Sequence, residues 1–266
     1  MTEAERKQII DLVQREVVPA IGCTEPIAVA LCVAKATETL GAKPEKIDVL
    51  LSANILKNAM GVGIPGTGMI GLPIAIALGA LIGKSEYQLE VLKDSNPAAV
   101  EEGKRFIGEK RIDISLKKNI TEKLYIEVCC KSGGNKATAI IAGGHTTFIY
   151  IARNGDVLLN KQSAGCGEEE AQVAGLTLRK VYDFAMNAPL DEIRFILETA
   201  RLNKAAAERS FDGNYGHGLG RMLRGNYEHK ILGDSVFSHI LSYTSGACDA
   251  RMAGAMIPVM SNSGSG

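Results

Sequence analysis

The chain has 266 residues, 46% of them hydrophobic, with 30 Lys and Arg against 30 Asp and Glu. This balance argues against nucleic acid and anionic membranes as partners, because binding either one requires an excess of basic residues. The first residues, MTEAERKQII, lack the apolar segment of a secretory signal, so we expect a cytoplasmic protein with reduced cysteines. None of its six cysteines stands in a C-x-x-C pair, so no structural zinc site is expected.

The first 51 residues predict two helices and a strand. Thr2 and Glu5 can form a capping box in front of the first helix. The second helix begins at TEP, where Thr24 is a suitable N-cap, and it ends near Gly41. The segment KIDVLLSAN, which follows, is typical of a short buried strand.

Residues 58–83 carry no charge and are the one candidate for a membrane span. The first half of this stretch, GVGIPGTGMIG, is too rich in Gly and Pro for a spanning helix, which needs about 20 apolar residues. We therefore expect a loop that leads into a buried helix from Leu72 to Gly83, with Pro73 in the first turn.

Residues 110–160 alternate between apolar and polar side chains, and the turn signals SGGN and RNGD separate the runs. The pattern predicts an antiparallel sheet of three to five strands. Helical spacing returns from residue 168, and a further helix is expected at 234–243.

The predicted fold class is α+β. We expect a mainly helical domain, residues 1–85 and 163–266, with a small antiparallel β-rich domain inserted at residues 86–162.

Two stretches before residue 70 are suited to chemistry. Cys23, in GCTEP, precedes a predicted helix start, where the helix dipole lowers a thiol pKa and suits a base, a nucleophile or a metal ligand. The alternative is a small buried residue of the core. Asn54, Lys57 and Asn58 fall on one side of a helical turn, where Lys57 could bind a carboxylate. GIPGTG could hold an anion with its backbone N–H groups, or it is a plain turn with Lys57 exposed.

Two later stretches are also candidates. His145, in AGGHTTF, falls at a turn before a strand, where an imidazole could serve as a general acid or base or have a structural role. Cys166 precedes an acidic helix start and is interpreted as part of a helix cap. The ending SNSGSG is either a linker or part of a binding loop.

The segments GCTEP, NILKNAMGVGIPGTG, GGHT and SGACDARMAGAMIPVMSNSGSG, in this order, resemble the L-cysteine desulfidase family, which is related to the iron–sulfur L-serine dehydratase alpha chains. The resemblance spans essentially the whole chain. It implies a lyase that converts L-cysteine by α,β-elimination into pyruvate, ammonia and hydrogen sulfide. It also implies a [4Fe–4S] cluster, whose open iron acts as a Lewis acid, in place of pyridoxal phosphate.

The resemblance also implies roles for individual residues. Cys23 becomes the candidate base, and His145 lies in or near the pocket. Two groups of side chains would bind the polar ends of the amino acid substrate: Asn54, Lys57 and Asn58, and Ser261, Asn262 and Ser263.

One departure from the family pattern concerns the cluster. Members of that family continue past SNSGSG, and the resemblance places their cluster-binding cysteines in the continuation. We therefore expect no metal ligands before Gly266, an N-terminal portion that is inactive alone, and either a homo-oligomer or a missing C-terminal fragment. Two alternatives stay open, an L-serine dehydratase and a non-catalytic module that binds a small amino acid.

Overall fold

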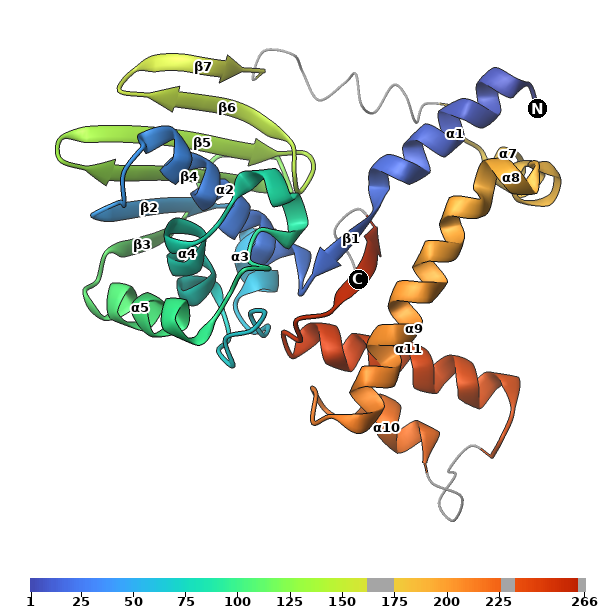
Figure 1. Ribbon diagram of the computed structural model, residues 1–266. Helices are drawn as coiled ribbons and strands as arrows, with labels where there is room; N and C mark the ends of the chain where they lie inside the picture. The colour runs from blue at the N-terminus through green and yellow to red at the C-terminus, as the bar shows by residue number, and fades with distance from the viewer. Residues whose placement is uncertain (162–174, 226–232, 263–266) are drawn as a thin grey trace.

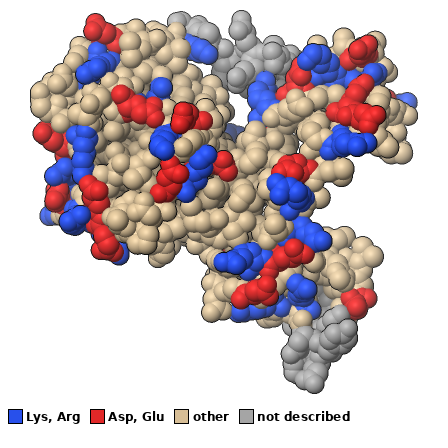
Figure 2. Space-filling view, in the orientation of Figure 1, with Lys and Arg blue, Asp and Glu red and all other residues tan. Residues whose placement is uncertain are grey.

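The computed structural model describes residues 1–161, 175–225 and 233–262. Figure 1 shows two parts, a sheet covered by helices and a group of longer helices beside it. Charged side chains of both signs are mixed over the face of the molecule drawn in Figure 2.

A six-stranded sheet forms one layer of the molecule, with the strand order β3-β2-β4-β5-β6-β7. Strands β2 and β3 are parallel, and the other neighbouring pairs are antiparallel. The strands are β2 (Lys46–Leu51), β3 (Ile112–Leu116), β4 (Tyr125–Ser132), β5 (Asn135–Ala142), β6 (Phe148–Arg153) and β7 (Asp156–Asn160). The predicted alternation is seen in β4, where Ile126, Val128 and Cys130 are buried on one face.

Helices cover one face of this sheet (Figure 1). They are α2 (Thr24–Leu40), α3 (Ala53–Ala59), α4 (Leu72–Leu81), the 3-10 helix η1 (Ser85–Glu90) and α5 (Pro97–Gly108). Helix α2 packs on β4 and β5, and α4 packs on α2 and α5. A Cβ at Gly79 would lie 2.6 Å from the carbonyl oxygen of Ala30, so this glycine lets α4 approach α2 closely. We call the sheet with α2 to α5 the body.

The remaining helices form a second part, which we call the arm. It consists of α1 (Glu3–Glu16), α7 (Leu178–Asn187), α8 (Leu190–Ile193), the 3-10 helix η2 (Arg194–Ile196), α9 (Leu197–Asp212), α10 (Leu219–Arg224) and α11 (Val236–Met252). Helices α9 and α11 pack together, with Phe211 and Tyr243 edge to face at 5.2 Å between ring centroids. Arg6 Nε lies 2.9 Å from Glu192 Oε2 and joins α1 to α8.

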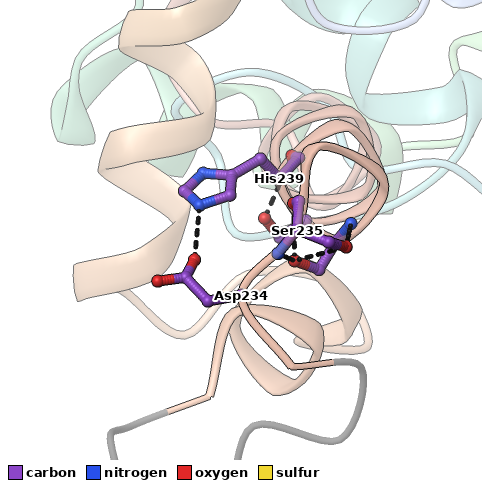
Figure 3. A network of polar contacts seen from close by, with 5 residues as sticks. Asp234, Ser235 and His239 are labelled. Carbon is purple, nitrogen blue, oxygen red and sulfur yellow. Dashed lines mark hydrogen bonds and ion pairs between the residues drawn. The ribbon is translucent and has the colours of Figure 1, made fainter.

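The start of α11 is a polar cap, shown in Figure 3. Ser235 and Ser238 form a capping box, and His239 Nε2 lies 2.8 Å from Asp234 Oδ1. These side chains satisfy backbone groups and a neighbouring carboxylate at the helix end.

A two-stranded ribbon joins the beginning and the end of the described chain. Strands β1 (Val17–Ile21) and β8 (Pro258–Asn262) pair antiparallel, with Val17 opposite Asn262. The ribbon places the residues after α11 beside those before α2. It thereby brings the C-terminal segment to the GCTEP loop.

The α+β prediction is confirmed, as are the capping box of α1 and the end of α2 at Gly41, whereas the N-cap of α2 is Cys23 and not the predicted Thr24. Helix α11 is longer than the predicted 234–243, because packing on α9 and α10 extends it through a Ser- and Gly-containing segment that looks like a loop in sequence. The sheet includes β2, which precedes residue 86, and the predicted division into two domains stays a prediction. Among the helices of the described ranges, none combines the length and apolar composition needed to cross a bilayer.

Candidate functional site

A buried thiol and a buried carboxylate lie together at the start of α2. Cys23 is the N-cap residue and is 9% exposed, and its Sγ–H donates to Glu25 Oε2 at 3.0 Å. Two further donors reach the same carboxylate, Thr24 Oγ1 at 3.2 Å and Asn58 Nδ2 from α3 at 3.2 Å. Glu25 thus holds the N-terminus of α2, the thiol and α3 in one polar cluster, which we call the Cys23 cluster.

The environment of Cys23 stabilises the protonated thiol. Burial, and then the hydrogen bond and charge of Glu25, raise the pKa of Cys23 from 9.0 to about 12. The prediction that the helix start lowers this pKa is therefore wrong. The helix dipole acts on the same thiol, but loss of solvent and an adjacent carboxylate are stronger effects.

Glu25 is the charged member of the cluster. Burial alone would raise its pKa, but the hydrogen bonds from Cys23 and its own backbone, the charge of His145 and the bond from Asn58 together lower it. A carboxylate in the first turn also suits the positive end of the helix. Glu25 is therefore ionised at neutral pH, next to a neutral thiol.

Arg251, in the last turn of α11, is a second buried charge. Its side chain is 7% exposed, Nε donates to the carbonyl oxygen of Gly22 at 3.1 Å, and Nη2 donates to Ser261 Oγ at 3.3 Å. In the described part of the chain, no carboxylate forms an ion pair with it. Neither Arg251 nor the role of Glu25 was predicted from the sequence. The available signal was the pair of charged residues Asp249 and Arg251 in the otherwise uncharged segment ACDARMAGA.

His145 lies in the turn between β5 and β6 and borders a pocket of about 470 Å³. Burial lowers the pKa of this imidazole from 6.5; Glu25 opposes the effect, and Arg251 adds to it. The ring is therefore neutral at neutral pH and can accept a proton. The pocket is also lined by Glu16, Gln88, Glu90 and Ser261.

The structure brings together part of the predicted set of substrate-binding residues. Asn58 belongs to the Cys23 cluster, and Ser261 is buried against Arg251. Asn54 and Lys57 are exposed on α3, and neither side chain makes a hydrogen bond or ion pair to a described residue. Asn262 ends β8, and Ser263 lies outside the described residues.

The GIPGTG segment is tied to the end of α11. The N–H of Gly63 donates to the Met252 carbonyl at 2.9 Å, and the N–H of Gly66 donates to the Gly254 carbonyl at 3.2 Å. A Cβ at Gly63 would lie 2.4 Å from the backbone of Ala253, so the backbones of these two segments are in direct contact. With these donors in use, the geometry favours the plain turn over an anion site.

The described cysteines do not fit a [4Fe–4S] cluster. Cys32 and Cys130 are in the hydrophobic core, Cys129 is on the opposite face of β4, and Cys248 is exposed on α11. Within the described ranges, no three His, Cys, Asp or Glu side chains gather as metal ligands would. Cys166 lies outside those ranges. The described residues therefore do not fit a [4Fe–4S] cluster as its ligands, and cluster-binding cysteines outside this chain stay a prediction.

Comparison with known proteins identifies relatives of this chain. It is 82% identical to a protein of Bacteroides fragilis and 78% identical to one of Bacteroides thetaiotaomicron, each over 266 residues, which is all of this chain and 62% of the relative. Over 273 residues it is 50% identical to a protein of Porphyromonas gingivalis, and it spans 63% of that relative. All three relatives are named UPF0597 protein. The chain thus spans less than two thirds of the UPF0597 proteins that it matches. No family model and no solved structure matches it.

The UPF0597 relatives correct the family named from the motifs. They match the whole chain at high identity, and neither a desulfidase nor a dehydratase name appears among them. The assignment to the L-cysteine desulfidase family was therefore wrong. Its motifs are short and rich in Gly and small residues, and such segments recur wherever a chain needs tight turns or close backbone approach.

Proposed function

We propose that this chain carries the acid–base part of a lyase site that acts on a small α-amino acid by α,β-elimination. The observation that carries the proposal is the buried guanidinium of Arg251, which has no carboxylate partner among the described residues and which influences a neutral imidazole at the edge of a pocket. A cytoplasmic setting, in which thiols stay reduced, belongs to the proposal.

Arg251 supports recognition of a carboxylate. A buried charge without a counter-ion is costly, and the carboxylate of an amino acid would compensate it with charge-assisted hydrogen bonds. Ser261 accepts a hydrogen bond from Arg251 and borders the pocket, so it connects the guanidinium to the pocket lining. The carboxylates of Glu16 and Glu90 border the same pocket and suit an ammonium group.

His145 supports removal of the α-proton. Its lowered pKa leaves the imidazole neutral, so it can accept a proton without first losing one. Cys23, predicted as the base, is protonated, with a pKa of about 12. We therefore assign the role of base to His145. Cys23 keeps its proton, which the Sγ–H shares with the Glu25 carboxylate through their hydrogen bond.

The leaving group separates two substrates. Elimination from L-cysteine releases hydrosulfide, which is a weak base and needs little protonation. Elimination from L-serine releases hydroxide, which needs a strong acid or a Lewis acid. A thiol with a pKa of about 12 is a poor acid, so the site favours L-cysteine, and L-serine stays the second candidate.

The test measures sulfide and pyruvate from L-cysteine, and pyruvate from L-serine, with this chain and with the longer Bacteroides fragilis relative. H145Q should remove product formation, and R251K should weaken substrate use by about tenfold, which corresponds to ~1.4 kcal/mol. H239Q is the matched control, because His239 is exposed at the start of α11. Absence of product from both amino acids with the longer protein would refute the lyase.

A non-catalytic module that binds a small amino acid is the second candidate function. The same buried Arg251 supports it, since carboxylate recognition requires no turnover. Titration calorimetry of this chain with L-cysteine and L-serine tests it. Binding that is lost in R251A, without product formation, would favour the module, and no heat from either amino acid would refute it.

A further inference from the structure

The arm exposes large apolar side chains on α7 and on α11. On α7, Leu178 is 86% exposed, Tyr182 62% and Met186 65%, and on α11, Val236 is 80% and Phe237 63% exposed. Figure 1 shows α7 and α8 at one end of α9, and it shows α10 and α11 at the other end of α9. We call these side chains, together with Leu190 and Ile240, the apolar face. Large apolar side chains are thus exposed near both ends of α9, and exposed apolar surface of this kind marks sites that bind another polypeptide.

Helix α7 has the pattern of a helix that packs on a partner. Leu178, Tyr182 and Met186 recur at intervals of four residues and thus lie on one side of the helix. Its polar side already has contacts, since Lys180 Nζ lies 3.4 Å from Glu5 Oε1 of α1. Helix α7 is therefore held by its charged side, while its apolar side faces solvent.

A mainly apolar pocket of about 380 Å³ lies between α9, α11 and β8 on the same arm. Tyr243, Ala247 and Met252 of α11 line it together with Val259 of β8. The pocket thus adds a further uncovered apolar region to the arm.

The length of the relatives indicates what covers this region. UPF0597 proteins that are 82% and 78% identical over the whole chain are longer, and the chain spans 62% of each. We propose that the apolar face binds the part of the UPF0597 polypeptide that lies outside the matched 62%. That part belongs to the same polypeptide in the relatives, so its effective concentration at the face exceeds that of a second copy. This inference does not depend on the proposed lyase activity.

The test places the same substitutions in two proteins. L178E and F237E are made in this chain and at the equivalent positions of the longer Bacteroides fragilis relative. In the relative, each should lower the Tm by several degrees, because a charge would be buried without a partner. In this chain, where both side chains are exposed, the Tm should not change. L158E is the matched control, since Leu158 is 65% exposed on β7 of the body.

Hydroxyl-radical footprinting of the unmodified proteins gives an independent readout. The positions equivalent to 178, 182, 186 and 237 should be labelled at least several-fold more slowly in the relative than in this chain, and position 158 equally in both. Equal labelling of the apolar face in both proteins, or an unchanged Tm for both substitutions in the relative, overturns the proposal. A doubling of this chain's mass in solution that L178E and F237E abolish would assign the face to a second copy and also overturn it.

Discussion

Replacing Glu25 by Gln should lower the pKa of the Cys23 thiol. In the native chain the thiol is 9% exposed, and its Sγ–H donates to Glu25 Oε2 at 3.0 Å. Burial first, and then the bond and the charge of Glu25, raise the pKa from 9.0 to about 12. Gln keeps the size of the side chain and one acceptor oxygen but removes the negative charge. It therefore removes the repulsion that a thiolate would meet at this position.

The size of the effect follows from the native pKa. A pKa change of 1 corresponds to ~1.4 kcal/mol, so the rise at Cys23 corresponds to about 4 kcal/mol between the two protonation states. Burial is the largest cause and is unchanged in E25Q, so Glu25 supplies the smaller share. We expect E25Q to lower the pKa by about 1, which leaves it above that of a free thiol.

The assay is alkylation by iodoacetamide, followed at the Cys23 peptide by mass spectrometry between about pH 8 and pH 11. The native rate should still rise about tenfold per pH unit at the upper limit, whereas in E25Q it should begin to level off. The exposed Cys248 reports reagent reactivity in the same sample, and E102Q, on the surface of α5, is the control variant. A native rate that levels off near pH 9, or identical profiles for native and E25Q, would refute the reasoning.

Three further predictions concern stability, measured by urea unfolding. Burial raises the pKa of Cys130 from 9.0 to about 12, so the stability that the protonated thiol contributes to the fold is complete below pH 9.0 and is lost as the pH rises toward 12. The free energy of unfolding of C130A should therefore depend less on pH than that of the native chain between about pH 8 and pH 10. An equal pH dependence of the two proteins would contradict this. Gln88 has φ 50° and ψ −125°, a backbone conformation that is strained for a residue with a Cβ and accessible to Gly. Q88G should therefore raise the free energy of unfolding by about 1 kcal/mol, and a decrease would show that the backbone at Gln88 is not strained. G79A should destabilise by about 3 kcal/mol, because its Cβ would lie 2.6 Å from the backbone oxygen of Ala30, and a change within error would contradict that contact.

Local sequence determined the elements that depend on local chemistry. The N-terminus of α2 follows from the first-turn residues after Cys23, and its end follows from Gly41, which adopts φ 75°. The run without charge at 72–81 forms a buried helix because helices and the sheet surround it. Alternation in β4 predicts its buried face. Each of these signals lies within about a dozen residues of the structure that it specifies.

The site could not be predicted in the same way, because its contacts join distant segments. Arg251 reaches the carbonyl of Gly22 across 229 residues of sequence, and Asn58 reaches Glu25 across 33. The position of Cys23 at a helix start was predictable, but its burial was not, and burial decides its pKa. Lys57 shows the converse, since its three-residue spacing from Asn54 is suitable for a shared helix face but its side chain faces solvent.

The contacts of Arg251 divide the site between the body and the arm. Cys23, Glu25 and Asn58 lie on α2 and α3 of the body and hold one another directly. Arg251 and Ser261 come from α11 and β8, and the bond from Arg251 to Gly22 links them to the residues before α2. A shift of α11 and β8 would therefore move the groups proposed to bind a carboxylate and leave the thiol–carboxylate pair intact. Because the pocket between α9 and α11 is also bordered by Arg251, polypeptide that packs on the arm would fix this residue. Under the proposed function, polypeptide that fills this pocket would therefore affect substrate binding through Arg251, whether or not it touches the substrate.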